Sequence, residues 1–251
     1  MIKLHNVSKT FNNKDDSNGL KPISLEIEDK KILGIVGENG AGKTTLIKIM
    51  TGLVIPSSGT VFYDNELLCH KTLREIYRKI SIVLDGGRSV QWRLTAKDNF
   101  YYYSTLKDVK DNEIKENIEK YKKMFKINEL IDKKVNDMSL GQKQLIAIVT
   151  ALISNCKYMF LDEPTNGLDL ETKCNLVEVL KKIKQDEDHT IVITTHDLEF
   201  LLSVADECVV MDRGKIIKSI NLDNEKFESS YKYYKDSFLG LETSYEKSTI
   251  N

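Results

Sequence analysis

A glycine-rich segment, Gly37 to Thr44, has the residue types needed to hold a phosphate chain. Its sequence, GENGAGKT, matches the pattern G-x-x-x-x-G-K-[ST] and leads into a segment of helical spacing, Lys43 to Met50. Glycines let the backbone wrap closely around an anion, and a helix that starts at Lys43 adds its positive N-terminal end. We therefore expect Lys43 to reach the β- and γ-phosphates of a nucleotide and the Thr44 hydroxyl to ligate Mg²⁺. The residues predicted here to contact nucleotide are Gly37, Glu38, Asn39, Gly40, Ala41, Gly42, Lys43, Thr44 and Thr45.

Two carboxylates follow an apolar run later in the chain. Tyr158 to Leu161 has the character of a buried strand, and Asp162 and Glu163 come directly after it, before Pro164. Because desolvating two acids at the end of a buried strand is costly, the pair favours a chemical role over an ordinary turn. Asp162 suits the Mg²⁺ side of a phosphate site, normally through water. Glu163 is suited to polarise an attacking water as a general base.

The segments around these residues alternate between strand-like and helix-like patterns. Half-buried or buried strands are expected at Ile2 to Val7, Ile23 to Ile27, Lys31 to Val36, Val61 to Tyr63, Ile80 to Leu84, Tyr158 to Leu161 and Thr190 to Thr194. Val209 to Met211 and Lys215 to Ile217 predict a closing hairpin. From about Arg88 to Asn155 charged helical sequence dominates, notably Asp111 to Asp132, which predicts an inserted helical lobe. This alternation indicates an α/β fold with a mainly parallel sheet.

The composition is that of an ordinary globular protein. The chain has 251 residues, is 41% hydrophobic and 30% charged, and carries a formal net charge of −1, which argues against broad nucleic-acid binding. Its four cysteines form no CxxC pair, and Cys156 and Cys208 are predicted to be small core residues. No apolar segment approaches the roughly 20 residues of a membrane span, so we expect a soluble chain that reaches a membrane only through a partner.

Met138 to Gln142, with the sequence MSLGQ, resembles the LSGGQ signature of ABC transporter nucleotide-binding subunits and precedes an apolar helix, as that signature does. Ser139 and Gln142 also fit a helix capping box, and both interpretations can hold together. The resemblance runs from Met1 to about Ile220 and implies a P-loop NTPase with a RecA-like core, an N-terminal antiparallel β subdomain and an inserted helical subdomain. The implied limits are 1–220 for a single ABC ATPase domain (1–87 and 156–220 for the core with the β subdomain, 88–155 for the helical subdomain) and 221–251 for a C-terminal tail of unassigned role.

The same resemblance implies further site residues. Asn166 to Asp169 matches the loop that crosses a dimer interface in this family, and His196 matches the switch histidine that senses the γ-phosphate beside the catalytic Glu163. Phe11 stands where the family often stacks an aromatic ring on adenine, with simple core packing as the alternative. The family presents the helix start after Met138 to ATP held by a second copy. The residues implied to contact that ATP are Ser139, Gly141, Gln142 and Asp169.

Two positions depart from the family pattern. The usual glutamine at the end of the strand Ile80 to Leu84, which contacts Mg²⁺, is replaced by Asp85. A carboxylate oxygen suits Mg²⁺ as well, so we expect Thr44, Asp85 and Asp162 to be the metal ligands, with Gln91 as an alternative to Asp85 if the loop shifts. Leu140 replaces the first glycine of the signature pair, while Ser139 and Gly141 are retained.

The resemblance implies an ATP-hydrolysing transporter subunit with ATP and Mg²⁺ as cofactors. Two copies, or one copy and a homologous subunit, would close head to tail around two ATP·Mg²⁺, bound to a polytopic membrane permease at the cytoplasmic face of the cell membrane. The segment Asp85 to Thr95 favours an exporter. Trp92 and Tyr101 to Tyr103 favour an interface or core over base stacking, and a docking surface for the membrane subunit is expected in this region.

Two other classes of protein share part of this pattern. A soluble ABC ATPase acting on ribosomes or DNA would share every motif, but such proteins usually join two cassettes or carry a long coiled-coil insertion. A P-loop kinase would lack Ser139 to Gln142. We expect no nucleic-acid partner.

Overall fold

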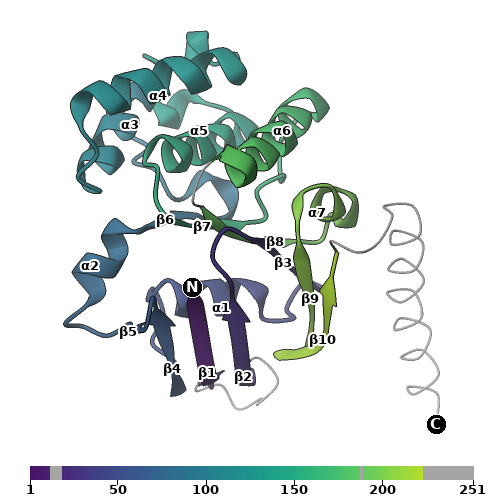
Figure 1. The fold of residues 1–251 in the computed structure, drawn as a ribbon. Coiled ribbons are helices and arrows are strands. Elements are labelled where there is room, and N and C mark those ends of the chain that lie inside the picture. The colour runs from purple at the N-terminus through teal and green to yellow at the C-terminus, as the bar shows by residue number, and fades with distance from the viewer. Residues whose placement is uncertain (12–18, 187–188, 223–251) are drawn as a thin grey trace.

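The computed structural model describes residues 1–11, 19–186 and 189–222 (Figure 1). The strands are β1 (Ile2–Lys9), β2 (Leu20–Ile27), β3 (Ile32–Val36), β4 (Ser58–Tyr63), β5 (Glu66–Leu67), β6 (Ile80–Val83), β7 (Tyr158–Asp162), β8 (Thr190–Thr195), β9 (Glu207–Asp212) and β10 (Lys215–Asn221). The α-helices are α1 (Lys43–Met50), α2 (Leu73–Arg78), α3 (Ala96–Thr105), α4 (Asp111–Met124), α5 (Leu140–Ile153), α6 (Leu170–Asp186) and α7 (Leu198–Val204). Short 3₁₀ turns are η2 (Asp85–Gly87), η3 (Asn128–Leu130) and η4 (Val135–Asp137).

A six-stranded sheet forms the centre of the molecule, in the order β10-β9-β3-β8-β7-β6. All neighbouring pairs are parallel except β10 with β9, which form the predicted hairpin. Every residue of β3, β7 and β8 is buried, because helices and the second sheet cover both faces. The predicted α/β fold with a mainly parallel sheet is therefore confirmed.

A second sheet of four antiparallel strands, in the order β2-β1-β4-β5, contains the N-terminal segment. Helix α1 packs its apolar residues Leu46, Ile47 and Met50 into one core with side chains of β1 and β3. The start of α1, where the glycine-rich segment ends, is thus held between the two sheets.

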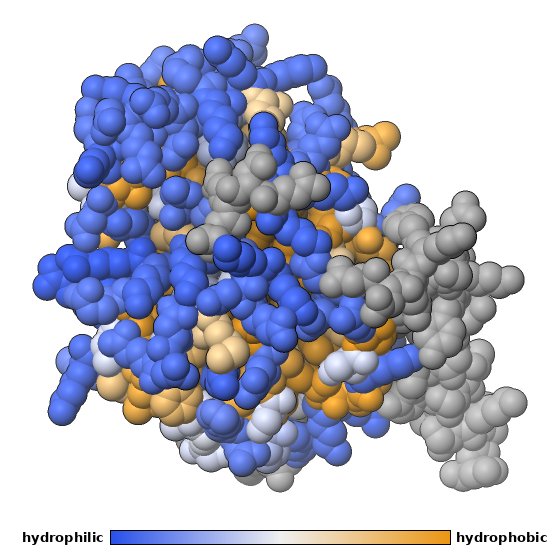
Figure 2. Space-filling view, in the orientation of Figure 1, coloured by the Kyte–Doolittle hydropathy of each residue, from blue (hydrophilic) through white to orange (hydrophobic). Residues whose placement is uncertain are grey.

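Helices α3, α4 and α5 form the lobe at the top of Figure 1, over the β6 and β7 end of the central sheet. They share a core that includes Phe100, Ile118 and Ile148. Figure 2 shows hydrophilic side chains covering this lobe, as the charged sequence predicts. The helix expected over Asp111 to Asp132 is shorter than predicted. It ends at Met124 because Lys126 takes the left-handed conformation, with φ of 52°, and turns Phe125 and Ile127 into the core.

The predicted C-terminal tail, 221–251, lies outside the described residues from residue 223 onward. In the part of the chain that is described, no helix is long and apolar enough to cross a membrane.

The four cysteines divide into two buried and two accessible side chains. Cys156 and Cys208 are each 2% exposed, as predicted for core residues, and burial raises the pKa of each thiol to about 11. Cys174 is exposed, and hydrogen bonding to Thr72 lowers the pKa of the half-buried Cys69.

We therefore expect iodoacetamide at about pH 8 to alkylate Cys69 and Cys174 in the native protein, because thiolate character and access control the reaction. Peptide mass spectrometry measures labelling at each cysteine, with a denatured sample, in which all four react, as the control. Fast native labelling of Cys156 would contradict its burial in the core.

Candidate active site

The glycine-rich segment forms a loop between β3 and α1 that encloses the ammonium group of Lys43. This side chain is 6% exposed, and its Nζ donates to the carbonyl oxygens of Gly37 (2.6 Å) and Glu38 (3.2 Å). Gly42 has a φ of 102°, which side-chain-bearing residues rarely adopt. At Gly37, a Cβ atom would lie 2.3 Å from the carbonyl oxygen of Met211, so a larger residue would push the loop off β9.

The first turns of α1 and α5 differ from those of the other α-helices described. Neither contains an acidic residue, whereas α2, α3, α4, α6 and α7 each carry at least one aspartate or glutamate there. No acidic side chain of the helix itself therefore neutralises the positive end of the helix dipole at the start of α1 or α5. Both ends suit an anion such as a phosphate group.

The carboxylate of Asp162 joins three elements at the end of β7. Thr44 Oγ1, at the start of α1, donates to its two oxygens at 3.1 and 3.0 Å, and Thr194 Oγ1 of β8 donates to Oδ1 at 2.5 Å. Asp162 is 3% exposed, so these bonds compensate for the loss of water around its charge. Thr44 and Asp162, two of the predicted metal ligands, are thus in direct contact.

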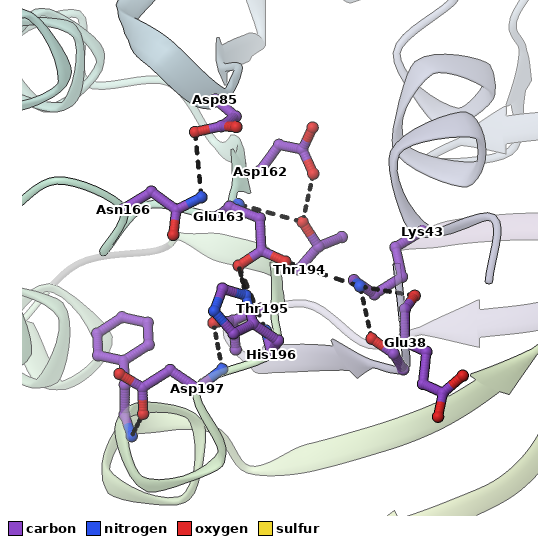
Figure 3. Close-up of polar contacts among 12 residues, drawn as sticks. Glu38, Lys43, Asp85, Asp162, Glu163, Asn166, Thr194, Thr195, His196 and Asp197 are labelled. Carbon is purple, nitrogen blue, oxygen red and sulfur yellow. Dashed lines mark hydrogen bonds and ion pairs between the residues drawn. The ribbon is translucent and has the colours of Figure 1, made fainter. Parts of the chain in front are cut away.

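Glu163 lies between Lys43 and His196 (Figure 3). Its Oε1 is 3.7 Å from Lys43 Nζ, and its Oε2 is 2.9 Å from His196 Nδ1. The Glu163 side chain is 12% exposed and that of His196 is 62% exposed. Glu163 also has a φ of 48°, an unfavourable conformation for a residue other than glycine. Its amide nitrogen donates to Thr194 O at 2.9 Å, which holds this backbone in place.

The segment that resembles the signature begins α5. Ser139 and Gln142 form the predicted capping box: Ser139 Oγ accepts from Gln142 N (3.2 Å) and Gln142 Oε1 accepts from Ser139 N (3.0 Å). Gly141 packs against the loop after Glu163, where a Cβ atom on Gly141 would lie 2.0 Å from Gly167 O. Asp169, in the same loop, accepts a hydrogen bond from Thr172 N, which lowers the pKa of its carboxyl.

The predicted signature residues stand apart from the phosphate loop of their own chain. Among the contacts of the described residues, none joins Ser139, Gly141 or Asp169 to residues 37–45. The structure therefore groups the predicted site residues into two sets, one around Lys43 and one at the start of α5.

Asp85 lies in the turn η2 after β6, and its Oδ1 accepts from Asn166 Nδ2 at 3.3 Å. Within the described residues, no hydrogen bond or ion pair joins Asp85 to Thr44 or Asp162. The alternative ligand, Gln91, has its backbone paired with the side chain of Asn99 and its amide 3.4 Å from Tyr103 Oη. Of the two, Asp85 is the one bonded to the loop that follows Glu163.

The remaining predicted residues lie at or near the surface. Phe11 is 39% exposed with Lys9 Nζ 5.6 Å from its ring centroid, so it is not a core residue. Glu38 and Asn39 are exposed, and Thr45 is half-buried. Sequence reasoning missed Thr194 as a partner of Asp162. A threonine at the end of an otherwise apolar strand was the available signal.

The donor set fits Mg²⁺ bound to a nucleotide. Mg²⁺ prefers oxygen ligands and is usually held by one or two carboxylates together with substrate phosphates. The hydroxyl of Thr44 and the carboxylate of Asp162 provide such oxygens beside the phosphate loop. The described residues contain no group of three or more His, Cys, Asp and Glu side chains that would hold a metal without a substrate.

We expect Thr194→Val to raise the Mg²⁺ concentration needed for half-maximal ATP turnover about tenfold, because a hydrogen bond to a charged group contributes about 1.5–3 kcal/mol. Thr194→Ser keeps the hydroxyl and is the matched control. A phosphate-release assay over a Mg²⁺ titration measures the effect. Equal Mg²⁺ dependence of the two variants would show that Thr194 does not support Asp162.

Comparison with known proteins places this geometry in a family. Residues 20–166 match the family described as ABC transporter. The chain is 32% identical to the ABC transporter ATP-binding protein NatA of Bacillus subtilis, over 86% of this chain and 88% of that protein. It is 32% identical to the methionine import ATP-binding protein MetN 1 of Bacillus cereus, over 87% of this chain and 64% of that protein.

Solved structures agree with this assignment. A dimeric structure of the ATP-binding cassette MJ0796, in a post-hydrolysis state bound to ADP and Pi, superposes with a TM-score of 0.81 at 28% identity, covering 90% of this chain and all of that one. The predicted P-loop NTPase fold is confirmed by this likeness. The chain therefore belongs to the ABC transporter family, in which it is an ATP-binding subunit and an ATPase.

Proposed function

We propose that two copies of this chain, or one copy and a homologous subunit, close head to tail around two ATP molecules and so drive a membrane-spanning partner. The separation of the two residue sets carries this proposal. The start of α5 has no acidic residue in its first turn, and in the described part of the chain no contact joins Ser139 or Gly141 to residues 37–45. The solved MJ0796 cassette is a dimer with ADP and Pi, which supports the same arrangement here.

Within one copy, the residues around Lys43 bind ATP and position water for attack on the γ-phosphate. Lys43 neutralises charge that develops on the transferred phosphate. Glu163, held between Lys43 and His196, accepts a proton from the attacking water, and His196 orients its carboxylate. Thr44, Asp85 and Asp162 are the proposed Mg²⁺ ligands, and a bound Mg²⁺ would supply further neutralisation of the phosphate charge.

The second copy completes the site. Ser139, Gly141, Gln142 and Asp169 would reach the ATP held by the partner's phosphate loop, and Phe11 would stack on adenine. The domain limits given above, with a helical subdomain at 88–155, belong to this proposal. The head-to-tail arrangement makes hydrolysis dependent on dimer formation.

A cavity of about 820 Å³ is the proposed docking surface for the membrane subunit. It opens between α2, β6, α3 and α5, is mainly apolar, and is lined by residues that include Tyr77, Leu106 and Ala151. Lys107 donates to the carbonyl oxygens of Tyr77 and Ile80 in its wall, and burial lowers the pKa of Lys107. An apolar helix of a permease fits such a cavity. This docking would hold the chain at the cytoplasmic face of the cell membrane.

The direction of transport stays a prediction. The sequence favours an exporter, whereas the relative MetN 1 is named an import protein and the name of NatA states no direction. A soluble ABC ATPase acting on ribosomes or DNA is the alternative function, and recovery of the chain with ribosomes instead of a membrane protein would favour it.

We expect Glu163→Gln to bind ATP normally, to lose nearly all turnover and to accumulate as an ATP-bound dimer, because it lacks the proton acceptor but keeps the shape. Phosphate release and size-exclusion chromatography with ATP measure these effects. Glu171→Gln, which removes an exposed carboxylate paired with Lys126, is the control and should behave as wild type. Near-normal turnover of Glu163→Gln would remove Glu163 from the role of base.

A second prediction concerns the cavity. Leu106→Glu places a charge on a side chain that lines it and is 55% exposed, so the isolated chain should keep its ATPase activity but lose co-purification with a membrane protein. Ile55→Glu is the matched control, since Ile55 is 79% exposed and does not line the cavity. Equal recovery of both variants with the membrane fraction would exclude this surface.

A further inference from the structure

The backbone of Gly87, in the turn after β6, is bonded on both sides, by a side chain of α5 and by a side chain of the loop that leads to α3. Gln144 Oε1, on the second turn of α5, accepts from Gly87 N at 2.8 Å. Trp92 Nε1 donates to Gly87 O at 2.9 Å. Lys143 Nζ in turn lies 4.5 Å from the Trp92 ring centroid, a cation–π distance. Two side chains thus bond to the backbone of Gly87, one at each of two consecutive peptide units, and Lys143 contacts the second of these side chains.

In the described structure, the side chain of Gln144 makes one hydrogen bond, the one to Gly87. Its side chain is fully buried, and its Nε2 has no hydrogen-bond partner in the described part of the chain. Burying an amide is unfavourable unless its polar atoms make hydrogen bonds. With only the bond to Gly87, the Gln144 side chain keeps an uncompensated desolvation cost at Nε2. An apolar residue would pack there without that cost. The bond itself is therefore the feature to explain.

The backbone of the turn is sterically restricted at Gly87. Gly87 has a φ of 65°, and a Cβ atom on it would lie 2.7 Å from Lys143 Cβ. Further along, both backbone groups of Gln91 pair with the side chain of Asn99 in α3. The chain from Gly87 to Gln91 is consequently attached to α5 and α3, although it follows directly from the central sheet.

This attachment connects the residue proposed to contact the nucleotide of its own copy, Asp85, to the helix start proposed to contact the nucleotide of the other copy. Asp85 lies two residues before Gly87 and faces the nucleotide of its own copy in the proposed function. Ser139 and Gly141 lie one turn before Gln144 and face the nucleotide of the other copy. The loop after Glu163 contacts both, through Asn166 to Asp85 at 3.3 Å and through Gly167 to Gly141.

We propose that Gln144 is a positioning residue that makes Asp85 and the start of α5 move together. Nucleotide binding at one site then changes the position of the α5 start, which would contact the nucleotide at the other site. The inference rests on the proposed dimer and adds to it a physical link between the two sites. Gln144 itself touches no nucleotide. Its loss should therefore affect communication between sites more than binding at either one.

The test replaces Gln144 with Met, which has similar length and volume but no hydrogen-bond acceptor of comparable strength. ATP affinity is measured by titration of the isolated chain, and kcat and the Hill coefficient are measured from turnover against ATP concentration. We expect wild type to show a Hill coefficient above one. Gln144→Met should keep ATP affinity within about twofold, lose at least fivefold in kcat and show a Hill coefficient close to one.

Two further variants separate this role from general stability. Trp92→Phe removes the other hydrogen bond to Gly87 and keeps the aromatic ring, so it should reproduce the lowered Hill coefficient even if Gln144→Met folds poorly. Thr150→Val is the matched control, because Thr150 is a buried polar residue of α5 whose hydroxyl bonds only to Ile146 O in the described structure. It should leave the Hill coefficient unchanged.

Dimerisation of Glu163→Gln tests the proposed dimer, and the Hill coefficients test the link through Gln144. If Glu163→Gln does not dimerise with ATP, the proposed function fails. If Glu163→Gln dimerises but the Hill coefficient is near one in wild type, or equal in wild type, Gln144→Met and Trp92→Phe, only the link through Gln144 is overturned.

Discussion

Buried charge at the carboxyl ends of adjacent parallel strands is the constraint on which the rest of the site depends. Lys43, Asp162 and Glu163 are all nearly inaccessible to water, and an uncompensated buried ion costs several kcal/mol. Their compensation comes from different elements: carbonyl oxygens of the loop before α1, the Thr44 hydroxyl and the Thr194 hydroxyl. The strand register that pairs Asp162 with Thr194 is consequently a requirement of the chemistry as well as of the sheet. A shift by one residue would turn Thr194 to the opposite face and leave the Asp162 carboxylate with Thr44 alone.

Much of this arrangement follows from local sequence. Apolar runs placed the buried strands within a residue or two, and the glycine-rich segment identified the loop before α1 without any tertiary information. Asp162 and Glu163 could be singled out because acids at the end of a buried strand are unusual. The capping box at Ser139 was likewise readable, since it involves only residues that are three positions apart.

Contacts between segments that are distant in the chain could not be predicted from local sequence patterns. The bond from Thr194 to Asp162 and the bond from Gln144 to Gly87 each span many residues, and hydroxyl or amide side chains in apolar segments have several ordinary explanations. The end of α4 was missed for a related reason. Apolar residues continue through Phe125 and Ile127, so the sequence shows no end to the helix there. The left-handed backbone at Lys126 nevertheless interrupts the helix while it keeps both apolar side chains in the core. The predicted boundary at residue 88 also separates Gly87 from the lobe, although the N–H of Gly87 donates to Gln144 of α5.

The left-handed backbone at Glu163 has a consequence for how this protein can change over evolutionary time. A non-glycine residue in that conformation costs on the order of 1–3 kcal/mol, a substantial part of the total stability of a domain. Glycine would relieve the strain and would also delete the carboxylate. Selection for thermal robustness alone would therefore erode the catalytic position, and only selection for turnover keeps glutamate there. The strained residue thus records a trade-off between stability and activity at a single position of the chain.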